Sequence, residues 1–136
     1  MTTNNQNIDQ ILRSAKRIAI VGLSEDPHKD SYRVAEYLQK HGYEIIPVNP
    51  KASQILGEKA YPDLKSIPSP VDIVDIFRKS EAVPAIVNEA IQTGAKTVWM
   101  QLGVHHPEAS AKAKMAGLYV VMDECIAVHH RLLKNS

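Results

Sequence analysis

The chain has 136 residues, which is enough for one domain with a core of its own and too few for two. Its 16 lysines and arginines stand against 15 aspartates and glutamates, a formal charge of +1, which gives no support to nucleic-acid or membrane-surface binding through bulk charge. No apolar run approaches the roughly 20 residues of a membrane span, and the polar stretch 1–10 lacks signal-peptide features. The single cysteine, Cys125, allows no internal disulfide, so we expect a cytoplasmic protein.

The spacing of apolar residues predicts helices and strands that alternate along the chain. Residues 8–15 are expected to form a short helix, and residues 17–21 a buried strand that ends at Gly22. Ser31 is the candidate N-cap of a helix over 31–41. The same patterns then predict a strand over 43–48, a strand over 71–77, a helix over 80–93, a strand over 96–100, a helix over 107–116, a strand over 118–122 and a helix over 123–133.

This alternation indicates an α/β fold, because parallel strands need right-handed crossover connections. We therefore expect a Rossmann-like, doubly wound parallel sheet of five strands with helices on both faces, in a single domain over 1–136. Numbered along the chain, the expected strand order is 3-2-1-4-5. The segment 51–70 is rich in proline and serine and is expected to lack a full crossover helix.

The candidate binding residues follow the strands, since ligands of open parallel sheets bind beyond the carboxyl ends of the strands. Gly22 would let backbone approach a ligand, while Ser24 and Ser31 offer hydroxyls beside a helix N-terminus that favours anions. An ordinary βα loop with a glycine turn and a serine cap explains these residues equally well. The remaining strand ends supply an amide, a second glycine, cations and an apolar wall: Asn49, Pro50, Lys51, Phe77, Arg78, Gln101 and Gly103.

The sequence lacks the G-x-G-x-x-G fingerprint of dinucleotide-binding folds. Where such folds carry an acidic residue for the ribose, this chain has Asn49-Pro50-Lys51. A lysine there suits a phosphorylated ribose, which argues against NAD and for an adenosine ligand that carries a phosphate. Coenzyme A and NADP both remain open on this ground, and a solvated loop lysine is the simpler alternative.

An ordered set of short motifs resembles the CoA-binding domain family, and the resemblance extends over about residues 8–133. The family includes stand-alone bacterial proteins and the N-terminal domain of the succinyl-CoA synthetase alpha subunit. The motifs are Ile20-Val-Gly-Leu-Ser24, Pro27, Ser31, Tyr37-Leu38, Gly42-Tyr43, Pro47-Val-Asn-Pro50, Asp75-Ile-Phe-Arg78, Gln101-Leu-Gly103, Glu108-Ala109 and Val121-Met-Asp-Glu-Cys125.

The resemblance implies a Rossmann-like fold that holds coenzyme A at the strand ends. By this analogy the pyrophosphate is expected at Gly22, Leu23 and Ser24, and the adenosine with its 3′-phosphate at Asn49, Pro50 and Lys51. Ile76, Phe77 and Arg78 are expected to flank the adenine or the pantetheine, and Gln101 and Gly103 the pantetheine arm. His129 stands where many relatives carry Glu, so we assign it no role.

The resemblance carries no catalytic residue over to this chain, because the phosphorylated histidine of succinyl-CoA synthetase lies on a further domain. Adjacent histidines on a helix point about 100° apart, so neither His105-His106 nor His129-His130 is arranged to chelate one metal, and we expect surface or loop histidines. Cys125 is expected to be a small core residue rather than a nucleophile.

We therefore expect a non-catalytic module that binds coenzyme A or an acyl-CoA. An NADP-dependent oxidoreductase and a CoA-binding subunit of a larger acyl-CoA enzyme are the alternatives. No nucleic-acid or membrane partner is expected, and a homo-oligomer or a partner enzyme remains open.

Overall fold

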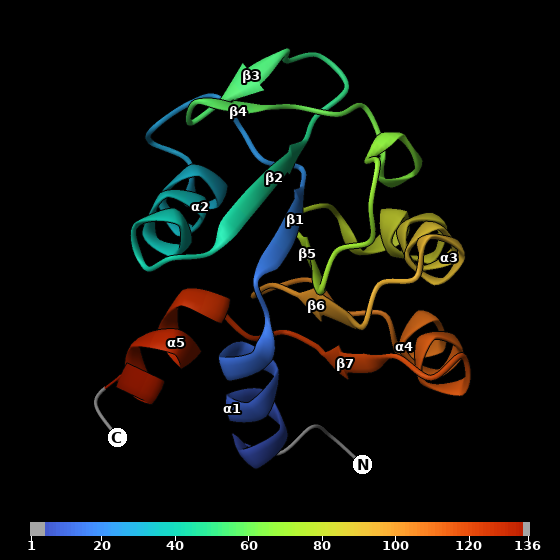
Figure 1. The fold of residues 1–136 in the computed structure, drawn as a ribbon. Coiled ribbons are helices and arrows are strands. Elements are labelled where there is room, and N and C mark those ends of the chain that lie inside the picture. The colour runs from blue at the N-terminus through green and yellow to red at the C-terminus, as the bar shows by residue number, and fades with distance from the viewer. Residues whose placement is uncertain (1–4, 135–136) are drawn as a thin grey trace.

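The computed structural model describes the backbone of residues 5–134 and the side chains of 7–133. In this part of the chain a parallel sheet is built from five strands, with helices on both faces (Figure 1). The strands of the sheet are β1 (Arg17–Val21), β2 (Glu44–Val48), β5 (Ile73–Ile76), β6 (Thr97–Met100) and β7 (Tyr119–Val121). The α-helices are α1 (Asn5–Ser14), α2 (Asp30–Lys40), α3 (Val83–Thr93), α4 (Pro107–Met115) and α5 (Ile126–Lys134). The expected α/β class and five-stranded doubly wound sheet are confirmed.

The strand order is β2-β1-β5-β6-β7, so the expected order 3-2-1-4-5 is wrong. The third strand of the sheet, β5, pairs with β1 and not with β2. The outer edge of β2 is occupied by the connection that follows it, because Tyr61 forms a parallel bridge with Val48 and its N–H donates to the carbonyl of Pro47. With that edge covered, the chain returns to the free edge of β1.

The connection after β2 contains no α-helix, as expected for the segment 51–70. It forms a small antiparallel hairpin from β3 (Gln54–Ile55) and β4 (Glu58–Lys59), and then a 3₁₀ turn, η1 (Leu64–Ser66). A second 3₁₀ turn, η2 (Ser80–Ala82), precedes α3.

Two apolar layers hold the helices to the sheet. Helices α1, α2 and α5 cover one face, and α3 and α4 cover the other (Figure 1). Alternate residues of each strand point to opposite layers, so Ile18 and Ile20 of β1 face α2 while Ala19 and Val21 face α3. Each fully buried isoleucine contributes about 1.5–3 kcal/mol through removal of its side chain from water.

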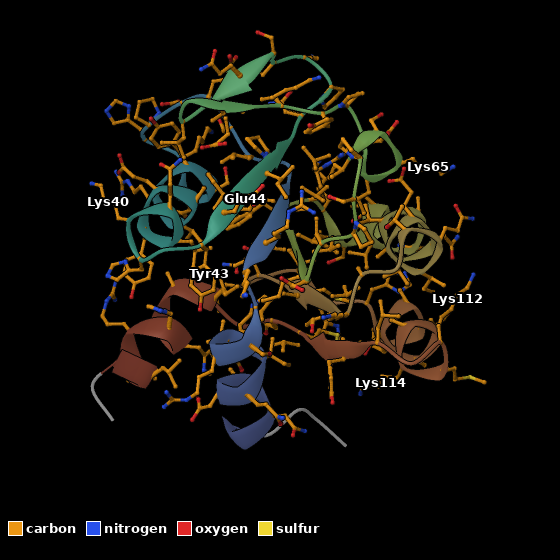
Figure 2. All side chains as sticks on the ribbon, in the orientation of Figure 1. Lys40, Tyr43, Glu44, Lys65, Lys112 and Lys114 are labelled. Atoms are coloured by element: carbon orange, nitrogen blue, oxygen red, sulfur yellow. The ribbon has the colours of Figure 1, made fainter. Side chains whose placement is uncertain are left out.

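Tyr43 joins three elements on the α2 face, and Figure 2 places it where α1, α2 and α5 approach one another. Its ring is buried and its hydroxyl donates to the carbonyl of Leu12 at 2.6 Å. Burial raises the pKa of this phenol above its ordinary value. His130 of α5 packs edge-on against the same ring and is itself buried, so the expectation of a surface position is wrong for this histidine. Within the described residues no helix is long and apolar enough to span a membrane.

Candidate functional site

A cleft of about 670 Å³ opens beyond the carboxyl ends of β5 and β6. Its walls come from the first turns of α2, from the segments that follow the two strands, and from the residue that precedes α5. The cleft is lined by charged, amide and apolar side chains and by the thiol of Cys125: Asp30, Arg33, Val34, Phe77, Arg78, Lys79, Gln101, Leu102, Val104 and Cys125.

This position is the switch point of the sheet. After β1 the chain turns to α2 on one face, and after the neighbouring strand β5 it turns to α3 on the other face (Figure 1). Such a divergence leaves a crevice between the two strand ends, which is where open α/β sheets bind ligands. The observed strand order therefore brings Phe77 and Arg78 directly beside the end of β1. The expected order would have placed them away from the switch point.

Gly22 lies where the end of β1 meets the backbone that follows β5. Its φ of +88° is unfavourable for any residue with a Cβ, and a Cβ at this position would overlap the carbonyl oxygen of Phe77 and approach Cδ of Arg78 to 2.9 Å. The N–H of Phe77 donates to the carbonyl of Val21, which joins the two strand ends. Gly22 thus allows the backbone after β5 to lie against the end of β1.

The loop between β1 and α2 is closed by its own hydrogen bonds. The N–H of Ser24 donates to the hydroxyl of Ser31 at 3.0 Å, and the Ser24 hydroxyl accepts from the N–H of Asp26. Leu23 is fully buried in the core. Ser31 is therefore not the N-cap of α2. The helix starts one residue earlier, at Asp30, and its N-cap Lys29 provides no side-chain hydrogen bond.

The loop after β2 lies beside the loop after β1. The side-chain amide of Asn49 donates to the carbonyl of Leu23 at 2.9 Å and accepts from the N–H groups of Lys51 and Ala52. Pro50 and Lys51 are exposed and do not line the cleft. The lysine side chain is thus free of the core, at the edge of the sheet next to the β1–α2 loop.

Hydrogen bonds from the end of β6 fix the segment that leads to α5. The side-chain oxygen of Gln101 accepts from the N–H of Ile126 at 3.1 Å, and Asp123 accepts from the N–H of Gly103 at 2.7 Å. Asp123 itself has a left-handed backbone, with φ of +61°, and this conformation is incompatible with a helix. For this reason α5 begins at Ile126, and the expected start at 123 is wrong.

Two histidines bind partners within the protein, while Cys125 lines the cleft. His106 caps α4 by accepting from the N–H of Ala109, and His129 pairs with Glu124 at 2.8 Å beside the indole of Trp99. Cys125 packs against the core layer beneath α2 and α5, as expected, but it is only half-buried and also lines the cleft. Among the residues that the structure describes, no group of three or more His, Cys, Asp or Glu side chains could hold a metal ion.

Three of the predicted site residues, Phe77, Arg78 and Gln101, line the cleft together. The side chain of Ile76 does not, because it is fully buried in the opposite layer, beneath α3. Sequence reasoning missed Arg33 and Lys79, which also line the cleft. The available signal was their position, one in the first turn of the helix after β1 and the other directly after Arg78.

A buried carboxyl lies on the strand that leads into the cleft. Asp75 of β5 is flanked by Ile20 of β1 and Trp99 of β6, and it shares its face of the sheet with Phe77, two residues further along. It is completely inaccessible to solvent, and neither of its oxygens has a hydrogen-bond partner in the structure. Burial therefore raises the pKa of this carboxyl well above its ordinary value.

A smaller cavity of about 220 Å³ lies at the opposite, amino-terminal edge of the sheet, between α1 and the starts of β5, β6 and β7. The charged side chains that line this cavity, Asp72 and Lys96, bind each other, and Asp72 also binds backbone N–H groups. Asp72 accepts from the N–H groups of Lys16 and Arg17 and pairs with Lys96 at 3.6 Å. The cleft at the switch point is the larger of these two cavities and the one where strand-end side chains converge, so we take it as the candidate site.

The fold defines a doubly wound α/β protein, and the cleft at its switch point is lined by three cationic side chains. Comparison with protein families identifies the class more closely. Residues 16–131 match the model of the CoA binding domain, and the chain belongs to this family.

Relatives of the chain fall into two groups. The YneT protein of Bacillus subtilis (strain 168) is 46% identical over 127 residues, which cover 93% of this chain and 94% of YneT. The ADP-forming acetate–CoA ligase II of Archaeoglobus fulgidus is 35% identical over 83 residues, 60% of this chain but only 12% of the ligase. Among solved structures, a hypothetical protein from Pyrococcus horikoshii OT3 has a TM-score of 0.94 and 41% identity, covering 97% of this chain and 93% of that protein.

Proposed function

We propose that the chain binds coenzyme A or an acyl-CoA in the cleft at the switch point, as a binding module rather than as an enzyme. The observation that carries the proposal is the cleft of about 670 Å³ lined by Arg33, Arg78 and Lys79, in a chain of the CoA-binding family. The cations suit the phosphates of the ligand, and apolar side chains such as Phe77 and Val104 suit its adenine and pantetheine parts.

Within this proposal Lys51 recognises the 3′-phosphate of the ligand. Asn49 holds the loop that carries this lysine against the β1–α2 loop, which leads into the helix that borders the cleft. The lysine is exposed, so its ion pair with a phosphate contributes up to about 1 kcal/mol, or about fivefold in affinity.

Titration calorimetry with CoA, dephospho-CoA and NADP tests the proposal. The chain is expected to bind CoA most tightly, dephospho-CoA about fivefold less tightly, and NADP more weakly than either. Lys51→Ala is expected to lower the affinity for CoA to that for dephospho-CoA, while the affinity for dephospho-CoA stays unchanged. Equal binding of all three ligands, or binding of none, would contradict the proposal.

A second candidate function is a CoA-binding subunit that acts with a separate acyl-CoA enzyme. The match to the acetate–CoA ligase favours it, because a domain like this one forms a small part of a larger protein there. A pull-down with the tagged chain from an extract of its own host, in the presence of CoA, is expected to recover an acyl-CoA-forming enzyme. Recovery of the chain alone would argue against this candidate.

A further inference from the structure

Most of the charged side chains that line the cleft are cationic. Arg33 comes from α2, while Arg78 and Lys79 follow β5, so the three cations reach the cleft from both sides of the switch point. Among the described residues that line it, Asp30 supplies the one carboxylate, which leaves a formal charge of +2. The whole chain has a formal charge of only +1, so the cleft concentrates positive charge that the rest of the surface balances.

The backbone of the β1–α2 loop is poorly placed to bind the same anion. In glycine-rich phosphate loops, free N–H groups surround the phosphate. In this loop the N–H groups of Gly22, Ser24, Asp26, His28 and Lys29 all donate to acceptors within the protein. Within residues 22–29 only the N–H groups of Leu23 and Glu25 lack an acceptor, so the loop backbone offers far fewer donors than a glycine-rich phosphate loop and side-chain cations must supply the rest.

The first turn of α2 reinforces the cations. Asp30 and Arg33 of this turn line the cleft, so the amino end of the helix borders it. The N-cap Lys29 provides no side-chain acceptor for the first N–H groups of the helix. Helix dipole and cations thus act on the same space.

We propose that Arg33, Arg78 and Lys79 together hold the diphosphate of the ligand and select for a diphosphate over a monophosphate. This inference rests on the proposed function and assigns the diphosphate to side chains, not to Gly22, Leu23 and Ser24. A doubly esterified diphosphate carries two negative charges, which match the +2 of the cleft. An arginine can also donate two parallel hydrogen bonds to one phosphate group, and cations on opposite walls can engage both phosphates at once.

Calorimetry with CoA, ADP and AMP tests the inference on Arg33→Gln, with Arg13→Gln on α1 as the matched control. Both arginines are exposed, so neither change removes a buried contact. Arg33→Gln is expected to weaken the binding of CoA and ADP about tenfold each, which is about 1.4 kcal/mol, and the binding of AMP much less, because the second phosphate loses its charge-assisted hydrogen bonds. Arg13→Gln is expected to bind all three ligands as the wild type does.

Lys79→Gln provides a second variant, with Lys112→Gln as its control. Figure 2 shows Lys112 on the outer side of α4, where it is exposed.

The proposed function and the assignment of the diphosphate are contradicted by different results. If the wild type binds neither CoA nor ADP, the proposed function itself is wrong. If the wild type binds CoA and Arg33→Gln binds it as tightly as Arg13→Gln does, or if AMP weakens as much as ADP, the function stands and the assignment of the diphosphate is overturned.

Discussion

Asp75 is the residue whose chemistry departs most from its surroundings. Ionising a carboxyl that is buried without a hydrogen-bond partner in the middle of a sheet costs several kcal/mol, so burial favours the neutral form of Asp75. Its pKa is raised in the folded state and ordinary, at 3.8, in the unfolded chain. Between these two values the folded state binds one more proton than the unfolded state, and the stability that this carboxyl contributes declines as the pH rises.

Asp75→Asn is therefore expected to remove the contribution of this carboxyl to the pH dependence of the free energy of unfolding. In the wild type this group lowers the free energy of unfolding by up to about 1.4 kcal/mol for each pH unit above 3.8, until its folded pKa is passed. The stability of the variant relative to the wild type should increase as the pH rises above 4, until the raised pKa of Asp75 in the folded state is passed. Urea denaturation at each pH measures this difference. An unchanged difference across the range, or the same trend in the exposed Glu81→Gln, would contradict the account.

Other residues show why the site was only partly predictable at this scale. Phe77, Arg78 and Gln101 were found because they directly follow strands, and strand ends are visible in the sequence. The sequence alone does not distinguish the two roles of Ser31, because a serine at the start of a helix can cap that helix or accept a hydrogen bond from the preceding loop. Only the course of the loop decides between the two.

At the scale of elements, the contact between the β1 loop and the end of β5 determines the shape of the cleft. Gly22→Ala is expected to destabilise the fold by about 2–4 kcal/mol, because the new Cβ adds overlap with Phe77 to an unfavourable positive φ. It should also weaken CoA binding, since Arg78 must move.

Gly42→Ala is the matched control for this change. Gly42 has a similar φ of +97°, but a Cβ there would meet nothing within 4 Å. Its substitution is expected to cost only the backbone term of about 1–2 kcal/mol and to leave CoA affinity unchanged. Thermal unfolding and calorimetry of both variants provide the comparison. Equal destabilisation by the two substitutions would show that the close approach at Gly22 is unimportant.

Most elements are predictable because each strand of the five-stranded sheet is a short, largely apolar run and each of α1, α2 and α3 has a regular apolar face. The strand order is not. The third strand of the sheet would bury the same residues beside β2 as it does beside β1. Both arrangements also allow right-handed crossovers. The deciding feature is the contact of Tyr61 with the outer edge of β2, which involves a segment without a strong pattern of its own. Arg33 was missed for a related reason, since it faces the cleft only because of where α2 lies.

At the scale of the whole molecule, the near-neutral chain and the cationic cleft are consistent with each other. Binding through bulk charge would need a basic surface, whereas a small polyanionic ligand needs only a few cations held by a rigid frame. Here the frame is the sheet with its two helix layers, and the cations stand at the one edge where the layers diverge.

Native mass spectrometry of the purified chain mixed with CoA tests the central claim most directly. The account predicts a complex of one CoA per chain, with much less of the complex for Arg33→Gln and an unchanged amount for Arg13→Gln. A spectrum in which the wild type carries no CoA at saturating ligand would contradict the account.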